Sequence, residues 1–169
     1  MKTQLITLSL LLIYFLTSAQ SAELEKRNGF KDIKLGSHID SVKETVFKKE
    51  ITNKEGQVSK IYETKHPDYL KIGEVKVDEV ELTTYNGLIY IIKVTADKDP
   101  RLMKGMEMAL GKAEWDLRND QYFWKATSLN LTFKSIEKNR VELTYNSYPV
   151  IQKMKTDLKK KVEEIADDF

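Results

Sequence analysis

The stretch that decides the fold is residues 74–96, which read EVKVDEVELTTYNGLIYIIKVTA. Apolar and polar residues alternate on both sides of Asn86-Gly87, and this dipeptide is a strong signal for a tight hairpin turn. We therefore expect strands near 74–84 and 88–96. Residues 88–92 are apolar at nearly every position, which predicts a central strand that is covered on both faces.

The length of the turn decides which side chains face each other across this hairpin. A two-residue turn would pair Val80 with Lys93 and would mix polar and apolar side chains on both faces. A three-residue turn, with Gly87 as a left-handed bulge, would pair Val80 with Ile92 and make one face consistently apolar. We predict the three-residue turn for that reason.

A second hairpin is expected around residues 137–139. Three loop residues there would pair Phe133 with Leu143 and leave one face apolar. Asn139 would take the left-handed position, which asparagine tolerates better than most residues.

Helical signals precede and follow the first hairpin. Ser37 and Asp40 resemble a capping box before apolar residues at helical spacing, which predicts a helix at about 38–48. Asp99-Pro100 predicts the start of a second helix that ends at Gly111. The remaining pattern predicts strands near 58–63, 121–126, 129–136 and 140–147, and an amphipathic C-terminal helix near 149–166.

This order of elements predicts an α+β fold with two helix–strand–strand–strand units. The units would form an antiparallel sheet with helices on one face, followed by the C-terminal amphipathic helix. They would cover about 29–96 and 97–169, which suggests an internal structural duplication within a single domain at 29–169. One six-stranded sheet and two smaller sheets both fit the pattern.

The first 22 residues predict export. Lys2 supplies a positive charge, residues 5–16 are almost all apolar, and small or polar residues follow to Ala22. This order is typical of a secretory signal peptide, here cleaved after Ala19. The apolar run is shorter than the ~20 residues that span a bilayer. We expect residues 1–19 to be removed, residues 20–28 to form a flexible tail, and the mature protein to be periplasmic or secreted without stable membrane insertion.

Composition excludes several classes of function. The chain has no cysteine, so it has no disulfide, thiolate metal site, cysteine nucleophile or lipid-anchored cysteine. A cysteine-free exported chain is more typical of a bacterium than of a eukaryotic secretory route. The net charge is only +2, whereas nucleic-acid binders are usually strongly basic. Glycine-rich phosphate-binding motifs are absent from the sequence, and we expect no cofactor.

Two histidines, His38 and His66, are the only candidates for imidazole chemistry. His66 and Asp68 lie close together in sequence, but two ligands are too few for a structural zinc site. Ser37 beside His38 lacks the motif that surrounds a serine nucleophile. We therefore assign no catalytic residue and no metal ligand. A hydrolase that uses carboxylates and His66 remains the alternative.

Aromatic residues are the strongest binding candidates. Trp115, Tyr122 and Trp124 lie close together in sequence, and Tyr122 and Trp124 share one face of the predicted strand. If that face is exposed, the three side chains offer a binding platform, since tryptophan and tyrosine dominate interface energetics. If it is covered, Trp124 belongs to the core.

The opening of the mature chain carries a local resemblance. Residues 30–36 read FKDIKLG and precede Ile39, Val42 and the predicted helix. This segment resembles a recurrent opening of bacterial envelope proteins. The predicted element order is similar to β-lactamase-inhibitor-like domains and to small outer-membrane assembly lipoproteins, although the lipid-anchor cysteine and the disulfide of those families are missing. The resemblance implies protein binding rather than catalysis.

These observations predict an exported, non-enzymatic binding module that recognises a protein or an envelope component. A structural envelope protein that oligomerises through a sheet edge is a third hypothesis.

Overall fold

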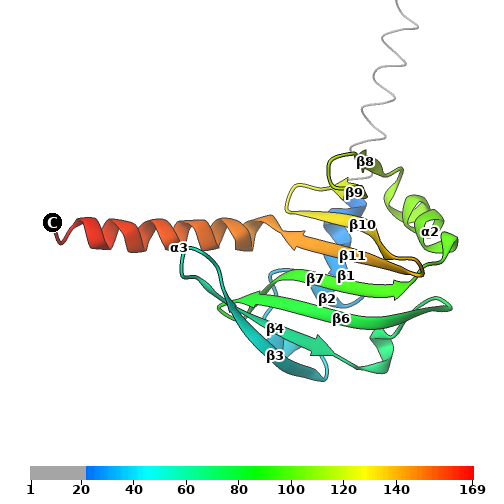
Figure 1. Cartoon of the computed structure of the whole chain (residues 1–169), viewed down its shortest axis with the longest axis horizontal. Helices are drawn as coiled ribbons and strands as arrows, with labels where there is room; N and C mark the ends of the chain where they lie inside the picture. The colour runs from blue at the N-terminus through cyan, green and yellow to red at the C-terminus, as the bar shows by residue number, and fades with distance from the viewer. Residues whose placement is uncertain (1–21) are drawn as a thin grey trace, which may run out of the picture.

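A computed structural model describes residues 22–169, and the predicted signal peptide lies outside these residues. The fold is dominated by one nine-stranded antiparallel sheet (Figure 1). Its strand order is β3-β4-β6-β7-β11-β10-β9-β8, with β5 paired to β6. The sheet therefore consists of two meanders whose last strands, β7 and β11, pair at the centre.

The elements have the following bounds. A separate hairpin is formed by β1 (Gly29–Phe30) and β2 (Ile33–Lys34), and η1 (Ile39–Ser41) and η2 (Pro67–Tyr69) are single 3₁₀ turns. The strands of the large sheet are β3 (Thr45–Thr52), β4 (Val58–Thr64), β5 (Lys71–Ile72), β6 (Val75–Tyr85), β7 (Leu88–Asp97), β8 (Glu114–Asp116), β9 (Gln121–Lys125), β10 (Leu129–Glu137) and β11 (Arg140–Ser147). Helix α2 (Pro100–Leu110) follows β7, and α3 (Tyr148–Ala166) follows β11.

The predicted α+β fold class is wrong, and the predicted helix at 38–48 is the main reason. That segment contains only the turn η1, and β3 begins at Thr45. Ser37 does not cap a helix, because its hydroxyl donates to the Lys34 carbonyl oxygen at 2.8 Å. Glu44 has a φ of 50°, which interrupts any helix. The β-branched and aromatic residues that follow pair with β4 instead.

The helices also do not lie on one face of the sheet. Leu102 of α2 belongs to the same buried cluster as Ile92 of β7. Val150 of α3 belongs to a second cluster, against which Ile91 of β7 packs. Because neighbouring residues of a strand point to opposite faces, α2 and α3 cover opposite sides of the sheet. The structure therefore contradicts the prediction of two helix–strand–strand–strand units with helices on one face.

The first hairpin has the expected apolar face but a different register. Asn86 and Gly87 both have positive φ and form a two-residue loop, since Tyr85 pairs with Leu88. A bulge between Thr83 and Thr84 in the pairing then shifts the register, so that Val80 faces Val94. The prediction of one apolar face is therefore correct. The register shift that produces it is a bulge within the paired strands, not a third residue in the turn.

The second hairpin pairs Phe133 with Leu143 as predicted. Its register shift again lies in the strand, between Ser135 and Glu137, and Glu137 pairs with Arg140 across a two-residue loop. Asn139 is not among the described residues with positive φ. The predicted pairing is therefore confirmed, but the predicted turn is wrong.

The N-terminal segment is ordered against the body of the protein. Residues 22–27, which the sequence suggested as part of a flexible tail, are helical, and Leu24 is buried. Glu25 accepts hydrogen bonds from the backbone N–H and the hydroxyl of Ser128, which lower the pKa of the Glu25 carboxyl. Gly29 follows with a φ of 141°, and a Cβ there would lie 2.2 Å from the Ile33 carbonyl oxygen. Only glycine fits at this position.

Within residues 22–169, no helix combines the length and apolar character needed to cross a bilayer.

Candidate functional site

The three aromatic candidates occupy two different environments. Trp124 is buried, and its indole N–H donates to the Gly111 carbonyl oxygen at 2.7 Å. Trp115 and Tyr122 are 47% and 39% exposed, and their ring centroids lie 4.6 Å apart in an edge-to-face arrangement. Trp124 therefore belongs to the core, whereas Trp115 and Tyr122 form an exposed aromatic pair on β8 and β9.

The two histidines have local structural roles. His38 and His66 each precede a 3₁₀ turn, where Nδ1 accepts from the backbone N–H two residues later. His66 Nδ1 also lies 3.3 Å from Asp68 Oδ2, which in turn is paired with Lys43 at 2.9 Å. Among residues 22–169, no cluster of three or more metal-ligating side chains is present. The arrangement of His66 with two carboxylates that the hydrolase alternative requires is not seen in this part of the chain.

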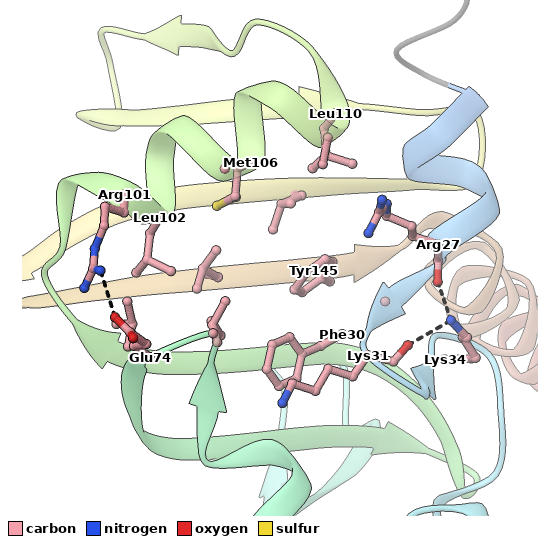
Figure 2. Close-up of a pocket in the computed structure, with 18 residues that line it drawn as sticks. Arg27, Phe30, Lys31, Lys34, Glu74, Arg101, Leu102, Met106, Leu110 and Tyr145 are labelled. Atoms are coloured by element: carbon pink, nitrogen blue, oxygen red, sulfur yellow. Dashed lines mark hydrogen bonds and ion pairs between the residues drawn. The ribbon is translucent and has the colours of Figure 1, made fainter.

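A cavity of about 620 Å³ lies between α2, the N-terminal segment and the sheet (Figure 2). Its floor is formed by Leu131 of β10 and by Leu143 and Tyr145 of β11. These residues lie on the sheet face that α2 covers. A volume of this size is typical of pockets that bind small organic molecules.

Helix α2 leaves the cavity open because it carries small residues on the cavity side. Gly105 and Ala109 line the cavity one turn apart, and nothing lies within 4 Å of the position where a Cβ of Gly105 would stand. Leu102 and Leu110, at the two ends of the helix, are buried and hold it on the sheet. The helix is thus anchored at its ends, and its middle faces free volume.

The wall opposite α2 comes from the N-terminal segment. Phe30 is 5% exposed and lines the cavity from β1. Arg27, Lys31 and Lys34 line the same side (Figure 2). The Lys34 ammonium donates to the backbone carbonyl oxygens of Arg27 at 2.7 Å and Lys31 at 3.0 Å. Since carbonyl oxygens carry no net charge, the positive charge of Lys34 is not neutralised by these bonds.

At the end of the cavity away from the N-terminal segment, the one basic side chain is paired with acidic side chains. Arg101, at the start of α2, pairs with Asp99 at 2.8 Å and with Glu74 at 3.0 Å (Figure 2). Glu74 comes from the turn between β5 and β6. The hydrogen bonds from Arg101 hold the pKa of the Asp99 carboxyl below its usual range. Positive charge is therefore concentrated at the N-terminal end of the cavity.

Tyr145 is the one polar side chain in the floor of the cavity. The residue is only 9% exposed, and burial raises the pKa of its phenol to about 12, while the charge of Arg27 acts in the opposite direction. Its hydroxyl forms no hydrogen bond with another described residue and contributes a neutral O–H donor at physiological pH. The hydroxyl is therefore available to a ligand in the cavity.

Sequence reasoning missed this site because its walls come from four distant segments. The N-terminal segment, the β5–β6 turn, α2 and the β10–β11 hairpin meet only in the folded sheet. One local signal was available, which is a glycine in the middle of a predicted amphipathic helix. Glycine makes a helix less stable than alanine does, so the presence of Gly105 in the middle of α2 indicates a role other than helix stability.

No protein-family model, curated protein or solved structure matches this chain, so its function must be argued from the geometry of the site.

Proposed function

We propose that this protein is an exported, non-enzymatic binding protein that holds an apolar small molecule in the cavity beneath α2. The observation that carries the proposal is the cavity itself, of about 620 Å³, whose floor is mainly apolar and whose charged residues lie at its two ends. Burial of apolar ligand surface there would supply the binding energy. The leader-like residues 1–19 support a periplasmic or secreted location, and the N-terminal residue of the purified exported protein tests that point.

Gly105 provides the sharpest test of the proposal. Replacement of Gly105 by leucine should narrow the cavity, because Gly105 is exposed where it lines the cavity and has open space at its Cβ position. The same change should raise the free energy of unfolding by about 1 kcal/mol, since glycine is a poor helix former. We expect Gly105→Leu to abolish binding of the neutral fluorophore N-phenyl-1-naphthylamine, measured by its fluorescence enhancement, while thermal unfolding shifts upward.

Gly105→Ala is the matched control. It should give the same gain in stability, because alanine is the best helix former, but it should retain most of the probe binding. The proposal is wrong if the wild-type protein does not bind the probe. It is equally wrong if Gly105→Leu binds the probe as tightly as Gly105→Ala, since the probe would then occupy another apolar surface.

A second candidate function is recognition of a protein or an envelope component through Trp115 and Tyr122. The observation in its favour is the exposure of this edge-to-face pair on β8 and β9, of which β8 is an edge strand of the sheet. Edge strands with exposed aromatic residues suit addition of a partner strand. Trp124 is not part of this surface, because it is buried against α2.

Trp115→Ala tests this second candidate. We expect capture of a specific envelope component, quantified by mass spectrometry after affinity purification, to fall about tenfold or more. Circular dichroism should be unchanged, because Trp115 is 47% exposed. Leu117→Ala is the control, since Leu117 is 85% exposed in the adjacent turn. Equal loss in both variants, or no loss in Trp115→Ala, would exclude the aromatic pair as the binding surface.

A further inference from the structure

We propose that the molecule held beneath α2 is a long-chain carboxylate, with its anionic head at Arg27 and Tyr145 and its chain along the apolar floor toward Arg101. This inference rests on the proposed function and adds the chemical class of the ligand and its direction in the cavity. It follows from three features: the free donors of Arg27, the unpartnered hydroxyl of Tyr145, and the uneven charge of the two ends.

Arg27 has donors to spare at the cavity. Its Nε donates to Glu23 Oε1 at 2.9 Å, one turn earlier in the same helical segment. A guanidinium carries five N–H groups, so the terminal nitrogens remain for a ligand. Figure 2 shows the Arg27 side chain reaching from the N-terminal segment over the cavity, on the side where Tyr145 lies. A planar fork of this kind matches a carboxylate in a bidentate arrangement.

Tyr145 supplies the second donor, and it comes from the floor of the cavity. The side chain is nine-tenths buried, lines the cavity, and has no hydrogen-bond partner among residues 22–169. Arg27 and Tyr145 both line the cavity and lie toward the same end of it in Figure 2. A carboxylate between them would accept from both and would satisfy the phenol O–H.

The distribution of charge gives the ligand its direction. The Arg27 end also carries Lys34, whose ammonium binds only backbone carbonyl oxygens. The Lys31 ammonium extends away from Arg27, past the Phe30 ring, and donates to the Asp68 carbonyl oxygen (Figure 2). At the other end, Arg101 is matched by two carboxylates. The side chains between the two ends are apolar and suit an alkyl chain; they include Ile72, Leu102, Met106, Leu110, Leu131 and Leu143.

Glu23 is the acidic side chain paired directly with Arg27, and it provides a second variant that tests the carboxylate site. Its carboxylate competes with a ligand for the guanidinium, although it occupies only the Nε side. Loss of the Glu23 charge should therefore strengthen the binding of an anion. Loss of the Arg27 charge should weaken it. Variants at the two ends of one ion pair thus have opposite expected effects.

The experiment compares laurate with dodecanol as competitors of N-phenyl-1-naphthylamine, each below its aggregation concentration, on protein exported and processed from the full-length chain. We expect laurate to displace the probe at a concentration about tenfold lower than dodecanol, because a charge-assisted hydrogen bond contributes at least this factor. Arg27→Gln should reduce this ratio to near one, and the ratio is compared within each variant so that it does not depend on the affinity for the probe. Glu23→Gln should keep or increase it, and Tyr145→Phe should lower it by a smaller factor.

Each outcome separates this inference from the function on which it rests. Probe binding without a preference for laurate, or a preference that survives in Arg27→Gln, would overturn the carboxylate assignment and leave the apolar cavity as a binding site. Dodecyl phosphate that competes better than laurate would also overturn the assignment of a carboxylate head. Absence of probe binding in the wild-type protein would refute the proposed function itself.

Discussion

Helices α2 and α3 begin in the same way and differ in what covers them. Each follows the last strand of a meander, and each starts with a polar cap and a nearby proline. Helix α2 is held on the sheet at both ends, where Leu102 and Leu110 are buried. Helix α3 contacts the body only through its first turns and then projects beyond the sheet (Figure 1).

The contacts of α3 show where its support ends. Val150 is buried against Tyr85, and Gln57 donates a side-chain hydrogen bond to the Met154 carbonyl oxygen at 2.7 Å. Tyr85 also donates to Asp157 at 3.2 Å. Every residue from 159 onward is exposed. The apolar stripe of α3 therefore continues beyond the part of the sheet that it could cover.

This difference shows that apolar residues at helical spacing predict where a helix forms, but they do not predict how much of that helix is buried. The stripe of α2 is short and interrupted by Gly105, yet it closes the core and borders the cavity. The stripe of α3 is longer and more regular, yet Val162 and Ile165 are 58% and 61% exposed. Burial depends on the length of the facing sheet, which periodicity does not encode.

The largest expected difference between the two helices is in the free energy of unfolding after one large apolar side chain is truncated in each. Leu102→Ala should lower the free energy of unfolding by about 2–5 kcal/mol, because it removes buried side-chain volume from the core. Ile165→Ala removes a side chain of the same size at an exposed position and should change the same quantity by less than about 0.5 kcal/mol. Urea denaturation followed by circular dichroism measures both.

The two variants also test whether α3 is unsupported at its distal end in solution. A loss of more than about 1 kcal/mol in Ile165→Ala would mean that something covers the stripe. In that case, sedimentation of the wild-type protein should show an oligomer assembled through α3, which differs from the predicted assembly through a sheet edge. An equally small effect in Leu102→Ala would contradict the packing of α2.

The elements nearest to strong local signals were predictable from the sequence. Asp99-Pro100 and Gly111 delimit α2 as expected, and the alternation on both sides of Asn86-Gly87 gave the β6–β7 hairpin. Pairing of Phe133 with Leu143 followed from the requirement for one apolar face. In each case the residues that determine the structure lie within one element or in adjacent elements.

Features that depend on distant segments were not predictable. The segment at 38–48 has helical spacing, but pairing with β4 makes its second half a strand, and no local pattern reports that pairing. Of the aromatic candidates, Trp124 is separated from Trp115 and Tyr122 because the end of α2 covers only part of their common sheet face. The cavity requires four segments at once, and Arg27 lay in residues that the sequence suggested were a tail.

The smallest expected effect concerns the caps that start the two helices. Asp99 accepts from the Arg101 backbone N–H at 2.8 Å, whereas the Ser147 hydroxyl lies 3.5 Å from the Val150 N–H. Asp99→Ala should therefore lower Tm by about 2–4 °C at neutral pH, and Ser147→Ala by less. Differential scanning calorimetry at a series of pH values measures both.

The pH dependence distinguishes the two caps, because only one of them titrates. Hydrogen bonds from Arg101 lower the pKa of Asp99 in the folded protein, so the stability that it contributes is present above the pKa of the unfolded chain, about 4, and is lost as pH falls through the folded pKa. The Tm difference between wild type and Asp99→Ala should thus shrink toward zero in acid, and the difference for Ser147→Ala should not follow this trend. A deficit in Asp99→Ala that persists at pH values below the folded pKa would show that Asp99 holds α2 by packing rather than by charge.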